Sequence, residues 1–207
     1  MQYSEWLPIY LDVIDDMGYD QNDDETSARL LKMIMCNRDL IDDDELGMHI
    51  SEESTIYGGA YKGGSVPLGT VIATGSSIPI LLSENIIPDI IVTDLDGDVE
   101  SQKKASRMGS VTVMHAHGDN AEAIIEHAQD FSGKVILTTQ SRPDMVIYNF
   151  GGFTDGDRAV CIARHFHSSV KLEGFDFDNI MSKDGSDPNV KKKKLQWAKR
   201  IIFELFS

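Results

Sequence analysis

The sequence D-L-D-G-D at positions 94–98 places three aspartates at every second position, directly after the apolar run I-I-V-T. Such a run predicts a short buried strand, so the aspartates follow its carboxyl end. Asp94 and Asp96 can point the same way and share a hard cation with phosphate oxygens, and Mg²⁺ fits these ligands best. Asp98 can either join them or cap a helix that begins at Val99.

A second polar turn, H-A-H-G-D-N at positions 115–120, also follows an apolar run. Its two histidines share a face of the predicted strand, because side chains two positions apart point the same way. Gly118 permits a tight turn, and Asp119 or Asn120 can cap the next helix. Two histidines and an aspartate could bind zinc, but oxygen-rich neighbours and the lack of a thiolate favour Mg²⁺ and phosphate chemistry.

A third segment, N-F-G-G-F-T-D-G-D-R at positions 149–158, joins a predicted strand to a predicted helix. Its three glycines allow a ligand to approach the backbone closely, and Thr154 can cap the helix. The helix N-terminus favours anions, yet Asp155 and Asp157 would repel a bare phosphate. They could instead accept hydrogen bonds from a ring with adjacent N–H groups, such as an aminopyrimidinone, or support the metal. The alternative is an acid-capped helix start.

Three further segments could contact phosphate groups. T-T-Q-S-R-P at 138–143 offers Arg142, although this signal is weak. I-Y-G-G-A-Y-K-G-G at 56–64 offers Lys62 and the backbone N–H groups of its glycines, at positions 58, 59, 63 and 64. K-K-K-K at 191–194 opens the last predicted helix, where a solvated surface is the simpler interpretation and a phosphate contact or lid the alternative.

The elements that must position these residues alternate between strand and helix from residue 54 onward. Strands are expected near 54–57, 70–73, 90–94, 111–115, 134–138, 145–149 and 169–173. Helices are expected near 76–84, 98–108, 119–130, 156–166 and 189–205, and G-S-D-P-N at 185–189 is typical of a surface loop. Right-handed crossovers would give a Rossmann-like α/β fold, with a mainly parallel sheet covered by helices. Ligands bind at the carboxyl edge of such sheets, where the three segments converge.

The first 53 residues differ from the rest in pattern and charge. Helical spacing predicts helices over 4–17 and 27–35, and residues 39–47 fit a short helix or an acidic turn. Residues 1–60 contain fifteen acidic and three basic residues, a net charge of −12, against −3 for residues 61–207. We expect a helical N-terminal region, residues 1–53, that provides solubility and packs against an α/β catalytic domain, residues 54–207.

Composition narrows the functional class. The chain has 207 residues, 41% of them hydrophobic, and a net charge of −15. This charge argues against a nucleic-acid partner, because phosphate backbones are held by Lys and Arg. The sequence has neither an apolar run near eighteen residues nor a signal-peptide pattern, so we expect a cytoplasmic protein without a membrane partner. Cys36 and Cys161 have no C-x-x-C partner and are expected to be packed thiols.

Four blocks occur in an order that resembles the archaeal 6-hydroxymethyl-7,8-dihydropterin diphosphokinase family, which is related to thiamine pyrophosphokinases. They are P-D-I-I-V-T-D-L-D-G-D, H-A-H-G-D-N, T-T-Q and N-F-G-G-F-T-D-G-D-R-A-V, and the resemblance extends over roughly residues 70–205, to K-K-K-K-L-Q-W-A-K-R-I-I. It implies transfer of diphosphate from ATP to 6-hydroxymethyl-7,8-dihydropterin with Mg²⁺, in tetrahydromethanopterin or folate-type synthesis. Kinases of this kind often form homodimers.

The resemblance also implies roles for individual residues. Asp94, Asp96 and Asp119 would bind Mg²⁺ and form the catalytic acidic cluster, and Asp119 could also accept the hydroxyl proton. The implied substrate contacts are His115, His117 and Asn120 on the nucleotide side, and Asn149, Thr154, Asp155, Asp157 and Arg158 on the opposite rim. We expect Asp155 or Asp157 to bind the guanidine-like edge of the pterin.

The resemblance is incomplete on the nucleotide side. The glycine-rich G-x-G-P-S turn and the A-D-G-A turn expected of such proteins are replaced here by the segment at 56–64 and by I-A-T-G-S-S at 72–77. Two other functions therefore stay open: a haloacid-dehalogenase-like phosphatase with Asp94 as nucleophile, because D-L-D-G-D is close to D-x-D-G-T, and a non-catalytic nucleotide or pterin sensor. An EF-hand is excluded, because the required glycine and glutamate are Val99 and Ala105. Thiamine could replace the pterin as acceptor.

Overall fold

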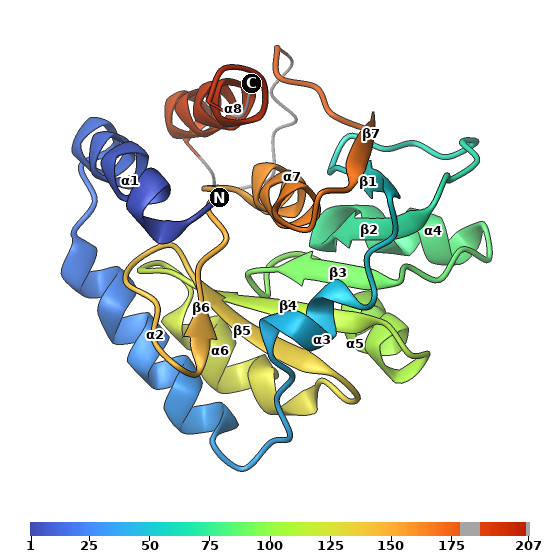
Figure 1. Cartoon of the computed structure of the whole chain (residues 1–207), viewed down its shortest axis with the longest axis horizontal. Helices are drawn as coiled ribbons and strands as arrows, with labels where there is room; N and C mark the ends of the chain where they lie inside the picture. Colours follow the sequence, from blue (N-terminus) through green and yellow to red (C-terminus); the bar gives the residue numbers. More distant parts are fainter. Residues whose placement is uncertain (179–186, 206–207) are drawn as a thin grey trace.

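The computed structural model describes residues 1–178 and 187–205. Within these residues, seven strands form one parallel sheet in the order β6-β5-β4-β3-β2-β1-β7 (Figure 1). The strands are Glu53–Tyr57 (β1), Thr70–Thr74 (β2), Ile90–Thr93 (β3), Val111–Ala116 (β4), Val135–Thr139 (β5), Ile147–Tyr148 (β6) and Ser169–Glu173 (β7). The predicted α/β class with a parallel sheet is confirmed.

The strand order determines which helices cover which face of the sheet. From β1 to β6 the chain advances in one direction, so right-handed crossovers place α4, α5 and α6 on one face. The return from β6 to β7, beside β1, runs the opposite way and places α7 on the other face (Figure 1). The helices are Ile78–Ser83 (α4), Val99–Arg107 (α5), Ala121–His127 (α6), Asp155–His165 (α7) and Pro188–Phe203 (α8), with short 3-10 turns at Gly75–Ser77 and Ala128–Asp130.

The hydrophobic core lies in layers on both faces of the sheet. Ile72 and Ile90 point toward α7 and belong to one buried cluster with Val160. Their neighbours Ala73 and Ile91 point the other way and belong to the cluster around α4. Burial of both faces explains why these strands are nearly continuous apolar runs rather than alternating ones.

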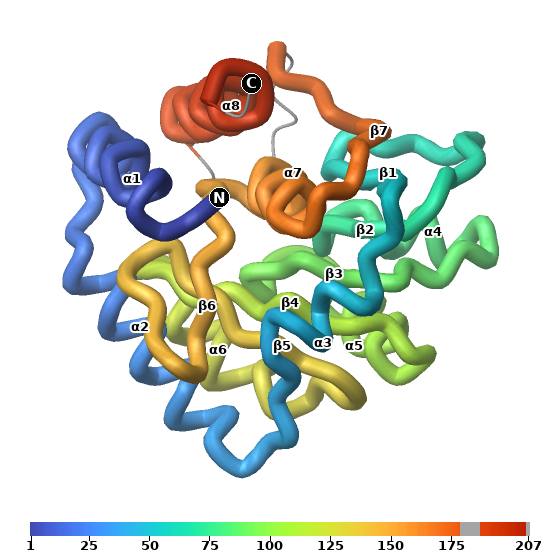
Figure 2. Tube along the Cα trace, viewed as in Figure 1, coloured from blue at the N-terminus to red at the C-terminus, as the bar shows by residue number. Residues whose placement is uncertain are grey.

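The N-terminal helices pack on both sides of this sheet. On α1 (Tyr3–Met17), the buried ring of Trp6 belongs to a cluster with Cys161 of α7 and Ile201 of α8. On α2 (Gln21–Met35), Leu31 packs in the cluster that contains Ile124 of α6. Figure 2 shows the chain passing from α1, beside α8, to α2, beside α6. A third helix, α3 (Asp43–Gly47), precedes β1.

Several element boundaries differ from the sequence prediction. Strand β6 contains only Ile147 and Tyr148, because Asp144 accepts the backbone N–H groups of Val146 and Ile147 and so holds residues 144–147 in a turn. Helix α2 begins six residues before the predicted start at position 27, because Asp20 caps it by accepting the N–H of Asn22 at 2.9 Å.

Other predictions on the periphery have mixed outcomes. The two cysteines differ: Cys161 is buried as predicted, whereas Cys36 ends α2 and is exposed, so the prediction of a packed thiol is wrong there. Of the predicted loop at 185–189, residues 185 and 186 lie outside the described ranges, and Asp187 caps α8. In the described part of the chain, every helix is too short or too polar to span a bilayer.

Candidate active site

The turn after β3 is held by buried side chains and contains an unusual backbone conformation. Leu95 has a φ of 67°, which is uncommon for a residue other than glycine, and its side chain is buried. Thr93 Oγ1 accepts the N–H of Leu95 at 2.8 Å and donates to Gln102 Oε1 at 2.6 Å. Gln102 Nε2 donates to the carbonyl of Asp96 at 2.7 Å. Because the backbone bends at Leu95, Asp94 and Asp96 do not follow strand alternation, although both line one cavity.

The turn after β4 is tied to the turn after β3 by Asn120. Its Oδ1 accepts the backbone N–H of His117 at 3.0 Å, and its Nδ2 donates to the carbonyls of His115 at 2.7 Å and Asp94 at 2.9 Å. His117 Nδ1 accepts the backbone N–H of Asp119 at 3.3 Å. On the other side of the ring, His117 Nε2 lies 3.4 Å from Asp94 Oδ2 and pairs with this carboxylate.

The start of α7 separates a structural aspartate from one that faces the site. Asp157 is fully buried and closes a capping box: it accepts the N–H groups of Phe153 at 2.6 Å and Thr154 at 2.9 Å, as well as the Thr154 hydroxyl. Asp155 instead accepts a hydrogen bond from Arg158 Nη1 at 2.8 Å. The buried Arg158 also donates to the carbonyl of Phe153 at 3.1 Å, so it supports this turn from behind.

The glycines of this segment allow close packing within the protein. Gly152 has a φ of 96°, and a Cβ there would lie 2.4 Å from the Cα of Arg158. A Cβ on Gly156 would lie 2.9 Å from the ring of Phe175. The sequence prediction assigned these glycines to ligand approach, but of the three only Gly156 borders a cavity.

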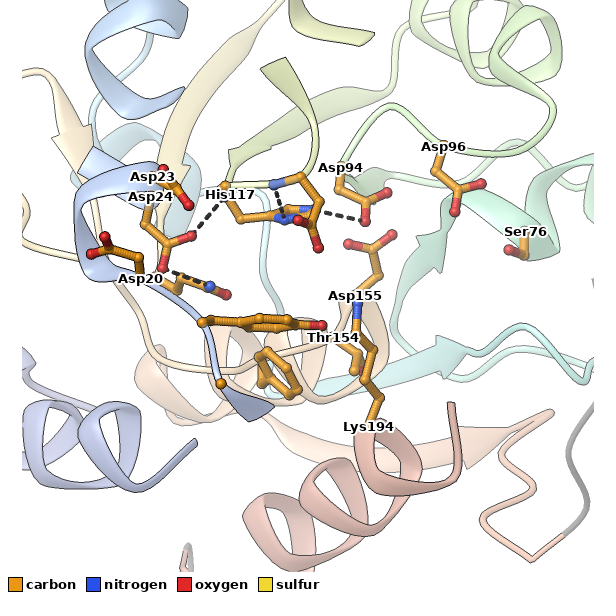
Figure 3. A pocket seen from close by; sticks show the side chains of 16 residues that line it. Asp20, Asp23, Asp24, Ser76, Asp94, Asp96, His117, Thr154, Asp155 and Lys194 are labelled. Carbon is orange, nitrogen blue, oxygen red and sulfur yellow. Dashed lines mark hydrogen bonds and ion pairs between the residues drawn. The ribbon is translucent and has the colours of Figure 1, made fainter. Parts of the chain in front are cut away.

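Asp94 and Asp155 face each other across the site and have opposite pKa shifts (Figure 3). Burial opposes ionisation of Asp94, but the hydrogen bond from His117 and the positive charges of Arg158 and Lys194 outweigh it and lower the pKa to about 2. Burial and the negative charge of Asp94 raise the pKa of Asp155 well above the usual carboxyl range, although Arg158 opposes this. Paired carboxylates with divergent pKa values are typical of functional sites.

Two cavities meet beside this pair of carboxylates: Asp155 borders both, and Asp94 borders the smaller one. The smaller, of about 340 Å³, contains Asp94 and His117 in its wall, and the larger, of about 610 Å³, extends toward Phe175 and α8. Both volumes fall in the range of small-molecule sites. The residues that border both cavities are Tyr19, Ser76, Asp96, Asp119, Thr154, Asp155 and Lys194.

The predicted site residues divide into those that line the cavities and those that support them. The lining residues are Asp94, Asp96, His117, Asp119, Thr154 and Asp155, together with Asp157, which borders the larger cavity with both oxygens already hydrogen-bonded. Four others border neither cavity: His115, Asn120, Asn149 and Arg158. Asn149 bonds to the carbonyl of Ser141 at 2.7 Å and accepts the N–H of Gly151 at 2.8 Å.

His115 lies behind the smaller cavity. It is 1% exposed, its Nδ1 lies 3.0 Å from Thr138 Oγ1, and its Nε2 is a buried atom without a hydrogen-bond partner. Burial and the nearby positive charge of Arg158 hold its pKa well below the usual value, whereas Gln140 acts in the opposite direction. His115 is therefore a neutral internal residue at neutral pH.

Of the residues that the sequence suggested more weakly as ligand contacts, some line the cavities and others do not. Asp98 caps α5, as one of its two interpretations predicted, by accepting the N–H of Ser101 at 3.1 Å and its hydroxyl at 2.7 Å. Arg142 and Lys62 border neither cavity, whereas the glycines at 58 and 59 line the larger one. In the run 191–194, Lys191 and Lys194 line the cavities, so a solvated surface describes only part of this run.

Sequence reasoning missed the contribution of the N-terminal region. Tyr19, Asp20, Asp23 and Asp24 line the smaller cavity, so this region does more than provide solubility and packing (Figure 3 labels the three aspartates). Gln140, the last residue of the T-T-Q block, lines the same cavity. The sequence contained one indication of this role. Asp24, in the D-D pair at 23–24, lies on the apolar face of α2, where a carboxylate is unusual.

The residues that border both cavities form what is called here the junction. Their carboxylates, together with Asp94, fit a hard divalent cation that is shared with a ligand. Among residues 1–178 and 187–205, no three His, Cys, Asp or Glu side chains converge closely enough to hold a metal ion alone. Mg²⁺ in nucleotide sites commonly takes one or two carboxylates and completes its shell with phosphates and water. The ionised Asp94 facing Asp155, with Asp96 and Asp119 in the same walls, meets that requirement.

A protein-family model and three curated relatives of this chain carry the same kind of name. The family model described as "6-hydroxymethylpterin diphosphokinase MptE-like" matches residues 68–181. Three curated relatives named 6-hydroxymethyl-7,8-dihydropterin pyrophosphokinase align with 98% of this chain. They are from Methanothermobacter thermautotrophicus (35% identical, 94% of its length), Pyrococcus furiosus (36%, 93%) and Methanocaldococcus jannaschii (35%, 95%).

Proposed function

The chain belongs to the MptE-like family of 6-hydroxymethylpterin diphosphokinases, and we propose that it transfers diphosphate from ATP to 6-hydroxymethyl-7,8-dihydropterin with the help of Mg²⁺. The products are AMP and the pterin diphosphate. This product would serve the synthesis of a tetrahydromethanopterin or folate-type cofactor.

The observation that carries the proposal is the meeting of two cavities at one acidic junction. A transfer between two substrates needs adjacent spaces whose reacting groups come together, since catalysis of phosphoryl transfer is mainly positioning and charge stabilisation. Asp96, Asp119 and Asp155 border both spaces. The junction is therefore the place for the reacting diphosphate.

The larger cavity suits the nucleotide. Phe175 and Phe177 have ring centroids 5.9 Å apart and offer apolar surface to a base. Gly58 and Gly59 follow β1 in the same wall and present backbone to the ligand, as the sequence predicted for a phosphate cradle. Lys191 adds positive charge.

Lys194 would contact the transferred diphosphate at the junction. It borders both cavities, and Figure 3 shows its side chain extending from α8 toward Thr154 and Asp155. A lysine in this position can contact the diphosphate both while it belongs to ATP and after its transfer to the acceptor. The conflict between anionic walls and an anionic substrate is eased further by Mg²⁺, which Asp94, Asp96 and Asp119 would bind, with Asp155 close by, and which would neutralise charge on the ATP phosphates.

The residues of the junction then have distinct tasks in the reaction. The hydroxymethyl oxygen of the acceptor forms a bond to the β-phosphorus of ATP, while the bond from that phosphorus to the AMP oxygen breaks in line. Asp119 accepts the hydroxyl proton, since it is an exposed carboxylate that borders both cavities. His117 holds Asp94 by its hydrogen bond, and Asn120 holds the backbones of both turns.

One assay tests the proposal against the other functions that the sequence left open. The purified protein is incubated with ATP, Mg²⁺ and 6-hydroxymethyl-7,8-dihydropterin, and AMP and pterin diphosphate are quantified. We expect equal amounts of the two products, and less turnover when thiamine replaces the pterin. Phosphate release from simple monoesters would instead indicate a phosphatase, and binding without turnover a sensor.

A further inference from the structure

The smaller cavity has a wall from a part of the chain that the family model does not cover. That model matches residues 68–181, whereas residues 18–20, 23 and 24 line this cavity. Given the proposed function, one of the two cavities must hold the acceptor. We propose that the acceptor occupies the smaller cavity and that residues 18–24, called here the N-terminal wall, select a flat heterocycle that is rich in N–H groups and carries no phosphate.

The N-terminal wall is fixed against the turn after β4. The backbone N–H of Gly118 donates to Asp24 Oδ1 at 2.7 Å. A Cβ on Gly118 would lie 2.8 Å from the Cβ of Asp23, which is closer than such atoms approach. Gly118 lies in the predicted tight turn, which the hydrogen bond from Asn120 N–H to the carbonyl of His117 at 3.2 Å closes. Its φ is not positive, so the turn itself does not require glycine, whereas the close approach of α2 does. The wall therefore has a set position relative to His117 and Asp119.

Asp24 connects the N-terminal wall to the other elements of the cavity. Asp24 is 3% exposed. Besides the bond to Gly118, its Oδ2 accepts the hydroxyl of Tyr10 at 2.7 Å and Nε2 of Gln140 at 2.9 Å. The indole of Trp6 donates to the carbonyl of Gln140 at 2.8 Å. Asp24 is thus a positioning residue, which holds α1, α2 and the residue after β5 in one arrangement.

The chemistry of the cavity distinguishes between the two substrates. Tyr19 and Phe153, with ring centroids 6.3 Å apart, provide aromatic surface on which a planar ring can stack. Asp20 and Asp23 are exposed carboxylates in the same wall. Carboxylates accept hydrogen bonds but cannot donate them, so they favour adjacent N–H donors and repel phosphate. An aminopyrimidinone edge fits this wall better than a triphosphate does, since Lys191 and the backbone of Gly58 and Gly59 are available to phosphate only in the larger cavity.

Asp155 and Asp157 suit the recognition of that edge less well. Both oxygens of Asp157 already accept hydrogen bonds from the start of α7. Asp155 faces Asp94 at the junction, where the diphosphate would lie (Figure 3). Of the other acidic side chains of the smaller cavity, Asp96 and Asp119 also border the larger one, and Asp24 is buried. Asp20 and Asp23 are the exposed aspartates that line the smaller cavity alone.

The test compares two double variants with the same change in charge. Asp20→Asn with Asp23→Asn removes the carboxylates of the N-terminal wall, and Asp12→Asn with Asp15→Asn removes two exposed carboxylates on α1 that border neither cavity. Loss of hydrogen bonds to charged groups predicts an increase of about tenfold or more in the pterin KM of the first variant, with the ATP KM within about twofold. The second variant should match the wild type.

A binding measurement on the unchanged protein makes the test independent of folding of the variants. Hydrogen exchange is followed with 6-hydroxymethyl-7,8-dihydropterin alone and with an ATP analogue that cannot transfer diphosphate. We expect the pterin to protect the amides of residues 18–24 and the analogue to protect those near Gly58 and Phe175. An unchanged pterin KM, or protection of residues 18–24 by the nucleotide only, would overturn the inference while leaving diphosphate transfer intact. Absence of turnover in the wild type would refute the proposed function instead.

Discussion

The two sides of the active site are built in different ways. On the sheet side, Asp94 and His117 follow strands, and Asp155 begins a helix. The amide side chains of Gln102 and Asn120 fix the turns after β3 and β4 through the backbone. On the other side, Tyr19 and Lys194 come from the two ends of the chain, which pack over the sheet. The reactive groups therefore belong to the parallel-sheet scaffold, whereas the enclosing walls depend on the packing of α1, α2 and α8.

The largest effect should come from the sheet side, at Asp94. Asp94→Asn removes the ionised carboxylate beside the junction and should lower kcat by up to about a thousandfold, since removal of a single preorganised electrostatic contact costs about a hundred- to a thousandfold in other enzymes. Asp98→Asn is the matched control, because Asp98 is four residues away, caps α5 and borders neither cavity. Formation of AMP and pterin diphosphate measures both. Equal activity of the two variants would remove Asp94 from the mechanism.

The next effect concerns the proton acceptor. Asp119→Asn retains the size of the side chain but cannot accept the hydroxyl proton, so kcat should fall about a hundredfold, with little change in the pterin KM. Steady-state kinetics in both substrates at several pH values checks this. A kcat within about threefold of the wild type, with the same pH profile, would show that another group takes the proton.

A smaller effect would test the contact between the two sides. Gly118→Ala places a methyl group where the Cβ of Asp23 lies 2.8 Å away, so α2 must move outward from the turn. The pterin KM should rise about tenfold, whereas the ATP KM should change little. If the pterin KM stayed the same, the position of α2 would have no influence on acceptor binding.

The smallest effect is on stability, and its sign follows from the pKa of Asp155. Because the folded protein raises this pKa, the ionised carboxylate destabilises the fold at neutral pH, and the penalty is lost as pH falls through the raised pKa. Asp155→Asn should therefore raise Tm of the metal-free protein by about 2–4 °C at pH 7.5, with no gain near pH 4. Thermal unfolding at both pH values measures this. A lower Tm at pH 7.5 would mean that the contact with Arg158 dominates.

The sheet side could be predicted from the sequence because its signals are local. Apolar runs that end in polar residues locate Asp94 and His117 at strand ends, and parallel pairing brings those ends to one edge. The same local pattern did not distinguish lining residues from supporting ones. His115 lies within β4 and His117 directly after it, so alternation predicts the same face for both, but only His117 lines the smaller cavity. That difference depends on which elements cover each side chain.

The enclosing walls were less predictable because they depend on contacts between distant segments. The acidic composition of residues 1–60 suggested a solvated surface, and nothing local links Asp24 to Gly118 or Gln140, which are 94 and 116 residues away. The four lysines at 191–194 look equivalent in sequence, but helical geometry directs Lys193 to Asp16 of α1 and Lys194 to the junction. The backbone strain at Leu95 had no sequence signal either.

The most direct test of the central claim follows the fate of the γ-phosphate at the junction of the two cavities. ATP labelled at the γ-phosphorus is mixed with excess protein, Mg²⁺ and 6-hydroxymethyl-7,8-dihydropterin in a single turnover. We predict that all converted label appears in the pterin diphosphate, together with an equal amount of AMP, and that Asp94→Asn abolishes both. Label in inorganic phosphate, or ADP in place of AMP, would contradict transfer of an intact diphosphate at this site.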